Sequence, residues 1–172
     1  MSSERNLAIV SRFIDEYQTG GDDRVFAETM HPDFVDRSLP PGIAAGPDGV
    51  RQQFDGFRAA LAGFRATIVH MAAADDIVMT HKVFRGTHVG EFLGVPATGR
   101  DIEIAVMDVV RLADGRIIEH WNVVDLFGVL AQLGALPVPG GIAVDSQGRV
   151  LARQNIWRWR DDALAPADVS NV

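Results

Sequence analysis

The 172-residue sequence contains no cysteine, a single lysine and no long apolar run. Without cysteine, the chain has no disulfide bond, no thiolate nucleophile and no cysteine-ligated metal. Schiff-base chemistry would depend on Lys82 alone, and we do not expect it there because Lys82 lies among apolar residues of a strand pattern. No segment approaches the roughly 20 apolar residues that span a bilayer, so no membrane association is expected.

The charge and composition narrow the class of protein further. The net charge of −7 argues against a nucleic-acid-binding protein, which would need a basic face. Hydrophobic residues make up 47% and charged residues 23%, which is typical of a globular domain. The first residues lack the basic and then apolar pattern of a signal peptide, so a cytoplasmic location is expected.

Hydrophobic periodicity predicts helices first and strands afterwards. Three amphipathic helices are predicted over residues 6–18, 23–30 and 48–64. Strands are predicted over residues 34–39, 65–71, 77–87, 101–112 and 115–125, with a short helix over 126–134. Ala113-Asp114-Gly115 predicts a hairpin. This order predicts an α+β fold in which a curved antiparallel sheet and three N-terminal helices enclose a cone-shaped cavity.

This layout predicts a cavity domain and a C-terminal extension. Residues 1–136 hold the helices and strands of the cavity domain. Residues 137–172 form a C-terminal extension, for which we predict a hairpin followed by a polar tail.

The strand over residues 115–125 ends on a carboxylate. Strict alternation puts Asp125 on the same face as Trp121 and places His120 on the opposite face. Desolvation beside apolar residues would raise the pKa of such a carboxylate, because burial disfavours its charged form. We therefore predict that Asp125 faces the cavity as an acid/base group and that His120 faces away from it. The alternative is that Asp125 only caps the following helix.

Asp108 and His81 are further candidates, because each shares strand parity with apolar residues. Asp108 and Asp125 could converge from neighbouring strands, which would push their pKa values apart and create an acid and a base. The alternative for Asp108 is a buried ion pair with Arg37 or Arg85. His81 could donate to a substrate oxygen or be a core histidine with its hydrogen bonds satisfied.

Other kinds of site are poorly supported. No two of the five histidines have the i, i+4 spacing of a helical zinc site, so no metal site is predicted. No G-x-S-x-G nucleophile turn and no phosphate-binding glycine loop are present. Acid–base chemistry by carboxylates and imidazoles remains.

Two motifs carry a family resemblance. Residues 86–99, GTHVGEFLGVPATG, resemble the G-T-H-x-G-x-[FL]-x-G-x-P-x-T-G signature of SnoaL-like polyketide cyclases. Residues 114–125, DGRIIEHWNVVD, and the later Gln132-Leu133-Gly134 resemble the D-G-[KR]-I-x-E-x-W-x-x-x-D and Q-L-G ending of that family. The resemblance extends over about residues 5–136. The family belongs to the nuclear transport factor 2-like superfamily, whose α+β cone agrees with the predicted layout.

The resemblance implies a cofactor-free enzyme that closes a ring in a hydrophobic, often polyketide, substrate by an intramolecular aldol reaction. The family's acid/base carboxylate matches Asp125, and Asp108 and His81 are expected to assist it. Homodimers or larger homo-oligomers are implied as well. Arg37 stands where many members carry His, and His81 stands where they carry Arg. The residues expected to contact substrate are His88, Trp121, Phe13, Tyr17, Phe34, Arg37 and Phe92.

The resemblance leaves the reaction open. The superfamily also includes epoxide hydrolases, isomerases, hydroxylase-like members and non-catalytic ligand binders. An epoxide hydrolase, a hydroxylase-like enzyme and a binder of small hydrophobic molecules therefore stand beside the cyclase hypothesis.

Overall fold

The computed structural model describes residues 2–39 and 42–136; the predicted hairpin and tail over 137–172 lie outside them. The helices are α1 (Ser3–Arg12), the π-helix η1 (Phe13–Thr19), α2 (Asp23–Thr29), α3 (Pro47–Ala60) and α4 (Leu126–Leu133). The strands are β1 (Met30–Asp36), β2 (Leu61–Ala74), β3 (Ile77–His88), β4 (Asp101–Ala113) and β5 (Arg116–Val124).

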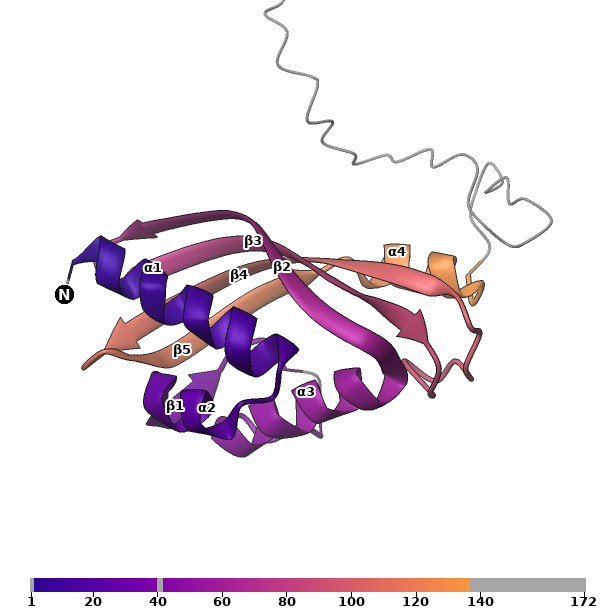
Figure 1. Ribbon diagram of the computed structural model, residues 1–172, viewed down its shortest axis with the longest axis horizontal. Helices are drawn as coiled ribbons and strands as arrows, with labels where there is room; N and C mark the ends of the chain where they lie inside the picture. Colours follow the sequence, from indigo (N-terminus) through magenta and orange to yellow (C-terminus); the bar gives the residue numbers. More distant parts are fainter. Residues whose placement is uncertain (1, 40–41, 137–172) are drawn as a thin grey trace, which may run out of the picture. The chain divides into compact units, whose positions relative to one another are not determined.

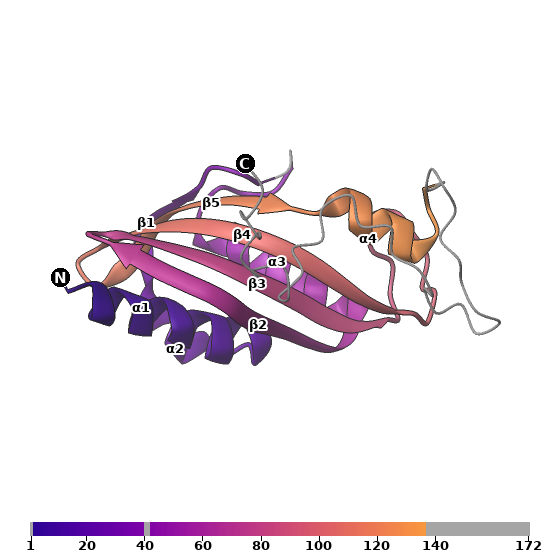
Figure 2. The same cartoon turned by 90° about the horizontal axis from the view of Figure 1, so that it is seen from above.

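The five strands form one sheet in the order β1-β5-β4-β3-β2. β2, β3, β4 and β5 pair antiparallel with their neighbours, whereas β1 joins the edge parallel to β5. Figures 1 and 2 show a curved sheet with α1, α2 and α3 on one of its faces and α4 beyond the end of β5. The predicted α+β fold is confirmed, and the parallel edge strand is an addition to it.

The turn between β4 and β5 forms at the predicted place. Asp114 has a φ of 50° and Gly115 a φ of 76°. Two successive residues with positive φ are what a type I′ hairpin turn requires, and Asp-Gly is among the pairs that adopt it most readily. The turn therefore aligns the two strands that carry Asp108, His120 and Asn122.

Several predicted element boundaries are wrong. The strand predicted over 34–39 is β1 at Met30–Asp36, and the strand predicted over 65–71 is β2 at Leu61–Ala74. The first predicted helix changes to a π-helix at Phe13, and the third ends at Ala60 instead of continuing to Phe64. Leu61 and Phe64 are buried residues of β2, where a register shift lies between Ala62 and Arg65 and Gly63 has a φ of 65°. A bulged strand can bury residues three apart, which imitates the spacing of a helix.

The core lies between the helices and the concave face of the sheet. β4 shows the pattern clearly, because alternate residues from Ile102 to Leu112 are buried. The outer face instead exposes apolar side chains, among them Met79, Met107 and Val123. Within the described ranges, no helix is long and apolar enough to cross a membrane.

Candidate functional site

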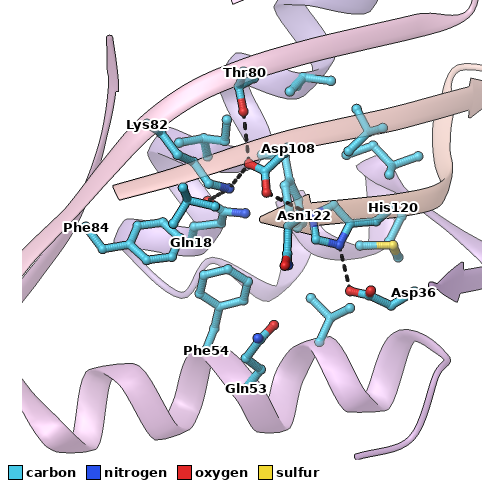
Figure 3. Close-up of a pocket in the computed structure, with 18 of the residues that line it drawn as sticks. Gln18, Asp36, Gln53, Phe54, Thr80, Lys82, Phe84, Asp108, His120 and Asn122 are labelled. Carbon is cyan, nitrogen blue, oxygen red and sulfur yellow. Dashed lines mark hydrogen bonds and ion pairs between the residues drawn. The ribbon is translucent and has the colours of Figure 1, made fainter. Parts of the chain in front are cut away.

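A cavity lies between the helix layer and the concave face of the sheet, and the empty space there, including solvent outside its opening, is about 650 Å³. Most of its wall is apolar and aromatic, with polar side chains on β1, β3, β4, β5, η1 and α3 (Figure 3). The polar lining residues are Gln18, Asp36, Gln53, Thr80, Lys82, Asp108, His120 and Asn122. An apolar cavity with a few convergent polar groups is the usual form of a small-molecule site.

A β-bulge in β5 decides which side chains face this cavity. Arg111 pairs with Glu119 and Leu112 pairs with Ile117, so Ile118 is an extra residue in β5. The extra residue reverses the alternation after it, because two residues of β5 oppose one of β4. Ile117 and His120 therefore both line the cavity. The prediction that His120 faces away from the cavity is wrong for this reason.

The imidazole of His120 is held between two carboxylates from different strands. Its Nδ1 lies 2.6 Å from Asp36 Oδ2, and its Nε2 lies 3.0 Å from Asp108 Oδ1. Burial lowers the pKa of His120, but hydrogen bonds to Asp108 and Asp36 outweigh it and raise that pKa above its usual value. Since carboxylates only accept hydrogen bonds, donation by both ring nitrogens describes the imidazolium form.

Asp108 sits in a cross-strand row formed by Thr80, Asp108 and Asn122. Its Oδ2 accepts from Thr80 Oγ1 at 2.9 Å and lies 2.6 Å from Lys82 Nζ. Desolvation would raise the pKa of Asp108, but the charge of Lys82 and the hydrogen bond from His120 hold it far below its usual range. Asp108 is therefore an anion with only 4% of its surface exposed.

Asp36 is fixed by its own loop. Ser38 donates to Asp36 Oδ1 through its backbone N–H at 2.9 Å and its hydroxyl at 3.0 Å. The same hydroxyl accepts from the backbone N–H of Asn122 at 2.9 Å. Desolvation opposes ionisation, yet the hydrogen bond to His120 and the two from Ser38 lower the pKa of Asp36.

Lys82 is the second cation of the site and is 3% exposed. Besides Asp108, its Nζ donates to Gln18 Oε1 at 3.0 Å and lies 5.0 Å from the ring centroid of Phe84. With His120 protonated, two cations and two carboxylates balance in this cluster, which is what a buried group of charges needs.

Three of the predicted site residues line the cavity, namely Asp108, Phe13 and Phe34. Asp108 faces the cavity as expected, but its basic partner is Lys82 and neither Arg37 nor Arg85.

Asp125 has a different position from the one predicted. Its side chain is the N-cap of α4, where Oδ1 accepts from the backbone N–H of Gly128 at 2.8 Å. It is exposed and is not among the residues that line the cavity. The cause is the bulge at Ile118, which turns Asp125 and its same-face neighbours outward. The alternative reading of Asp125 as a helix cap is confirmed.

Trp121 and His81 lie on the outer face of the sheet instead of lining the cavity. Trp121 is an exposed residue that the bulge turned outward. His81 has the predicted parity, but the cavity side of β3 carries Thr80 and Lys82. The Nδ1 atoms of His81 and His70 lie 3.2 Å apart across β2 and β3.

The other predicted contact residues pack outside the cavity lining. Tyr17 is buried against aromatic rings such as Phe26, and burial raises its pKa. His88 Nδ1 accepts from the backbone N–H of Thr98 at 3.2 Å, and Phe92 packs against Phe57. Arg37 donates to Glu119 Oε1 at 2.7 Å near the sheet edge.

The sequence argument missed His120, Lys82, Asp36 and Gln18. Lys82 did leave a signal, since it is the only lysine and shares its strand parity with Val78 and Phe84. His120 had no readable signal, because nothing in the local sequence marks Ile118 as a bulge. The place of Asp36 in the cavity could not be predicted, because it depends on the pairing of β1 with the distant strand β5.

The arrangement suits proton transfer. A buried imidazole between two anions can give up and recover a proton, and the apolar wall excludes water. In the part of the chain that the structure describes, no group of three histidine or carboxylate side chains is arranged so that it could hold a metal ion.

Comparison with known proteins places this fold and cavity in a family. A model of the SnoaL-like polyketide cyclases matches residues 8–133. Nogalonic acid methyl ester cyclase of Streptomyces nogalater is 32% identical over 130 residues, which are 70% of this chain and 91% of that protein. The structure of IdmH from Streptomyces antibioticus is similar with a TM-score of 0.67 and 33% identity, covering 75% of this chain and 98% of the other. TsrD from Streptomyces laurentii gives a TM-score of 0.73 at 26% identity, covering 79% and 99%. The chain therefore belongs to the SnoaL-like polyketide cyclase family of enzymes.

Proposed function

We propose that this protein is a cofactor-independent cyclase that closes a ring in a hydrophobic, polyketide-like substrate by an intramolecular aldol-type reaction. The observation that carries the proposal is the imidazole of His120, bonded to Asp36 and Asp108 inside an apolar cavity. Family membership and the similarity to nogalonic acid methyl ester cyclase support the substrate class.

An aldol closure needs two proton transfers. A carbon next to a carbonyl must act as the nucleophile through its enol, and the attacked carbonyl oxygen must receive a proton. A single residue can serve both steps if its two protonation states are close in free energy at the working pH. Histidine meets this condition more easily than a carboxylate whose pKa is held very low.

His120 enters the reaction as the acid. Its Nε2 bond to Asp108 is the longer of the two, and Asp108 keeps its bonds from Thr80 and Lys82 if this bond opens. A substrate carbonyl oxygen can therefore take the place of Asp108 Oδ1 at Nε2. The bond to Asp36 meanwhile keeps the ring in position.

The protons balance over the cycle. The enol carbon forms a bond to the carbonyl carbon while the imidazolium gives its Nε2 proton to the carbonyl oxygen, which becomes a hydroxyl. The enol hydroxyl loses its proton as its own carbonyl re-forms, and the neutral imidazole takes that proton up. The product has the same mass as the substrate, and His120 returns to its starting form.

The apolar wall contributes orientation. Phe34, Phe54 and Phe84 line the cavity from β1, α3 and β3. Rings on several sides hold a flexible chain folded so that its reacting ends meet. The loss of conformational entropy is then offset by binding and does not add to the barrier of the reaction.

His120→Gln tests the proposal with nogalonic acid methyl ester as the probe substrate. We expect kcat/KM to fall by about 10² to 10⁴, the range of general acid–base catalysis. His81→Gln is the matched control, because His81 is on the outer face of the sheet and should keep the wild-type rate. Chromatography with mass detection measures conversion to a product of unchanged mass, and circular dichroism checks folding.

Three results would contradict the proposal. The first is a folded His120→Gln variant with the wild-type rate. The second is a product heavier by one water or one oxygen atom, which indicates a hydrolase or a hydroxylase. The third is a ligand-induced rise in melting temperature without turnover, which indicates a binding protein.

A further inference from the structure

The amide of Gln18 offers hydrogen-bond donors inside the cavity that the protein itself does not use. Its Oε1 accepts from Lys82 Nζ at 3.0 Å. The assignment of the two amide atoms follows from chemistry, because an ammonium only donates and must face the oxygen. The Nε2 of Gln18 has no hydrogen-bond partner within residues 2–39 and 42–136, although Gln18 is only 5% exposed.

Lys82 adds a donor at the same place. An ammonium has three N–H groups, and two of them are engaged by Asp108 and Gln18. The rings of Phe54 and Phe84 lie beside the pair in the cavity wall (Figure 3). A ligand oxygen that enters the cavity can accept from both groups, and hydrogen bonds from a charged donor are among the stronger ones.

The position of Gln18 is built by the π-helix. η1 covers Phe13–Thr19, and π-helical turns are frequently found at functional sites. Arg58 Nη1 donates to the backbone carbonyls of Tyr17 and Gln18 at 3.2 and 3.1 Å, which secures the end of η1. Thr19 Oγ1 accepts from the backbone N–H of Ala66 at 3.0 Å, which ties η1 to β2. Gln18 is therefore held at the cavity by contacts with two other elements.

We propose that Gln18 and Lys82 form a donor pair that binds an acceptor oxygen of the ligand, so that the cavity selects ketones and quinones over hydrocarbons of the same shape. The proposal rests on the proposed function in taking this cavity as the substrate site. Asp108 contacts both Lys82 and His120, so a productive substrate presents two oxygens, one to each side of that carboxylate.

A pair of tricyclic ligands tests the donor pair without turnover. Fluorenone and fluorene have the same shape and differ in a carbonyl against a methylene group. We expect the wild-type protein to bind fluorenone about tenfold more tightly, as one hydrogen bond to a charged or buried donor implies. Isothermal titration calorimetry at a fixed co-solvent concentration measures both dissociation constants.

Two variants of Gln18 separate the role of its side-chain N–H donors from that of its hydrogen bond with Lys82. Gln18→Glu keeps an acceptor for Lys82 and removes the N–H donors, and Gln18→Met removes both. We expect each variant to lose most of the preference for fluorenone through weaker fluorenone binding, with fluorene binding unchanged. Gln52→Glu is the matched control, because Gln52 is exposed on α3.

The outcomes are distinct from those of the cyclase test. Equal affinity of the wild-type protein for the two ligands, or no binding of fluorenone, overturns the donor pair whether or not the protein is a cyclase. A fluorenone preference that survives in both Gln18 variants overturns it too. The protein could also fail to cyclise the probe substrate and still prefer fluorenone in a way that depends on Gln18. That result would contradict the cyclase proposal and would support the donor pair.

Discussion

Asp36 and His120 are opposite residues in the parallel ladder between β1 and β5, and Asp36 Oδ2 lies 2.6 Å from His120 Nδ1. The backbone supports the same pairing, since the N–H of Arg37 donates to the carbonyl of His120 at 2.9 Å. β1 follows the early helices and β5 is the last strand among the described residues, so this contact joins distant parts of the chain. The parallel edge strand thus supplies one of the two anions that favour the imidazolium.

Asp36→Asn is expected to shift the pH dependence of activity. The amide keeps the size of the side chain but removes a negative charge, so the pKa of His120 falls. If His120 acts as the imidazolium, activity declines as the pH rises through that pKa. The decline should therefore move to lower pH by about one unit, the size expected for a charge-assisted hydrogen bond. Profiles of kcat/KM against pH measure the shift.

The control for this prediction is Asp33→Asn. Asp33 is an exposed carboxylate on the same strand and is not among the residues that line the cavity. Its profile should superimpose on that of the wild type. A profile of Asp36→Asn that also superimposes would mean that Asp36 does not set the protonation of His120.

The stability of the protein should depend on pH through the same imidazole. The pKa of His120 is raised in the folded state, because hydrogen bonds to Asp108 and Asp36 outweigh its burial. Its contribution to the free energy of unfolding is then fully present below the unfolded pKa of about 6.5 and is lost as the pH rises through the folded value. Asp36 and Asp108 have lowered pKa values, so their contribution is lost only as the pH falls below about 4.

Urea unfolding of the wild type and His120→Gln measures this directly. The difference between their free energies of unfolding should be largest between about pH 5 and 6.5 and should shrink towards pH 9. A difference that stays constant over this range would show that His120 stabilises the fold by packing alone.

Local pattern predicted much of the fold and one part of the site. Alternation in β4 placed Asp108 on the buried face correctly, because β4 pairs with β3 without a register shift. The Asp114-Gly115 turn was readable because few residue pairs accept positive φ twice. These features depend on residues close together in the chain.

The remainder of the site depends on features that a local pattern does not contain. One extra residue in β5, Ile118, exchanged the faces of His120 and Asp125 and so reversed which of them reaches the cavity. The contacts of Asp36 with His120 and of Lys82 with Gln18 join elements that are far apart in the sequence. Leu61 and Phe64 were assigned to a helix because they are three residues apart. They belong to β2, where a bulge at Gly63 buries residues at the same spacing.

Asp125 should behave as a structural cap. Asp125→Asn keeps a good N-cap residue, so the free energy of unfolding should change little, whereas Asp125→Ala should lower it by about 1 kcal/mol. Both variants should keep the wild-type kcat/KM, because the side chain of Asp125 is exposed and outside the cavity lining. Denaturant titration and turnover of the probe substrate check the two statements. A folded Asp125→Asn variant that loses turnover by orders of magnitude would return the catalytic role to Asp125.

The ion pair between Lys82 and Asp108 should be strongly coupled. Lys82→Met leaves a carboxylate buried without its nearest cation, which should lower the free energy of unfolding by about 3 kcal/mol. In Lys82→Met/Asp108→Asn that charge is absent, so the loss should be smaller than the sum of the two single losses by about 1–3 kcal/mol. Urea titration of the four proteins gives this coupling energy.

Arg85 and Glu103 offer a matched ion pair on the same two strands. They are also cross-strand neighbours of β3 and β4, with 2.9 Å between Arg85 Nε and Glu103 Oε1, but their side chains are 32% and 43% exposed. Their coupling in Arg85→Met/Glu103→Gln should stay below about 1 kcal/mol, because water and salt screen exposed charges. Equal coupling at the two positions would mean that the cavity pair is hydrated in solution. An imidazolium in a hydrated cluster would be screened from Asp36 and Asp108, and the raised pKa of His120 would lose its physical cause.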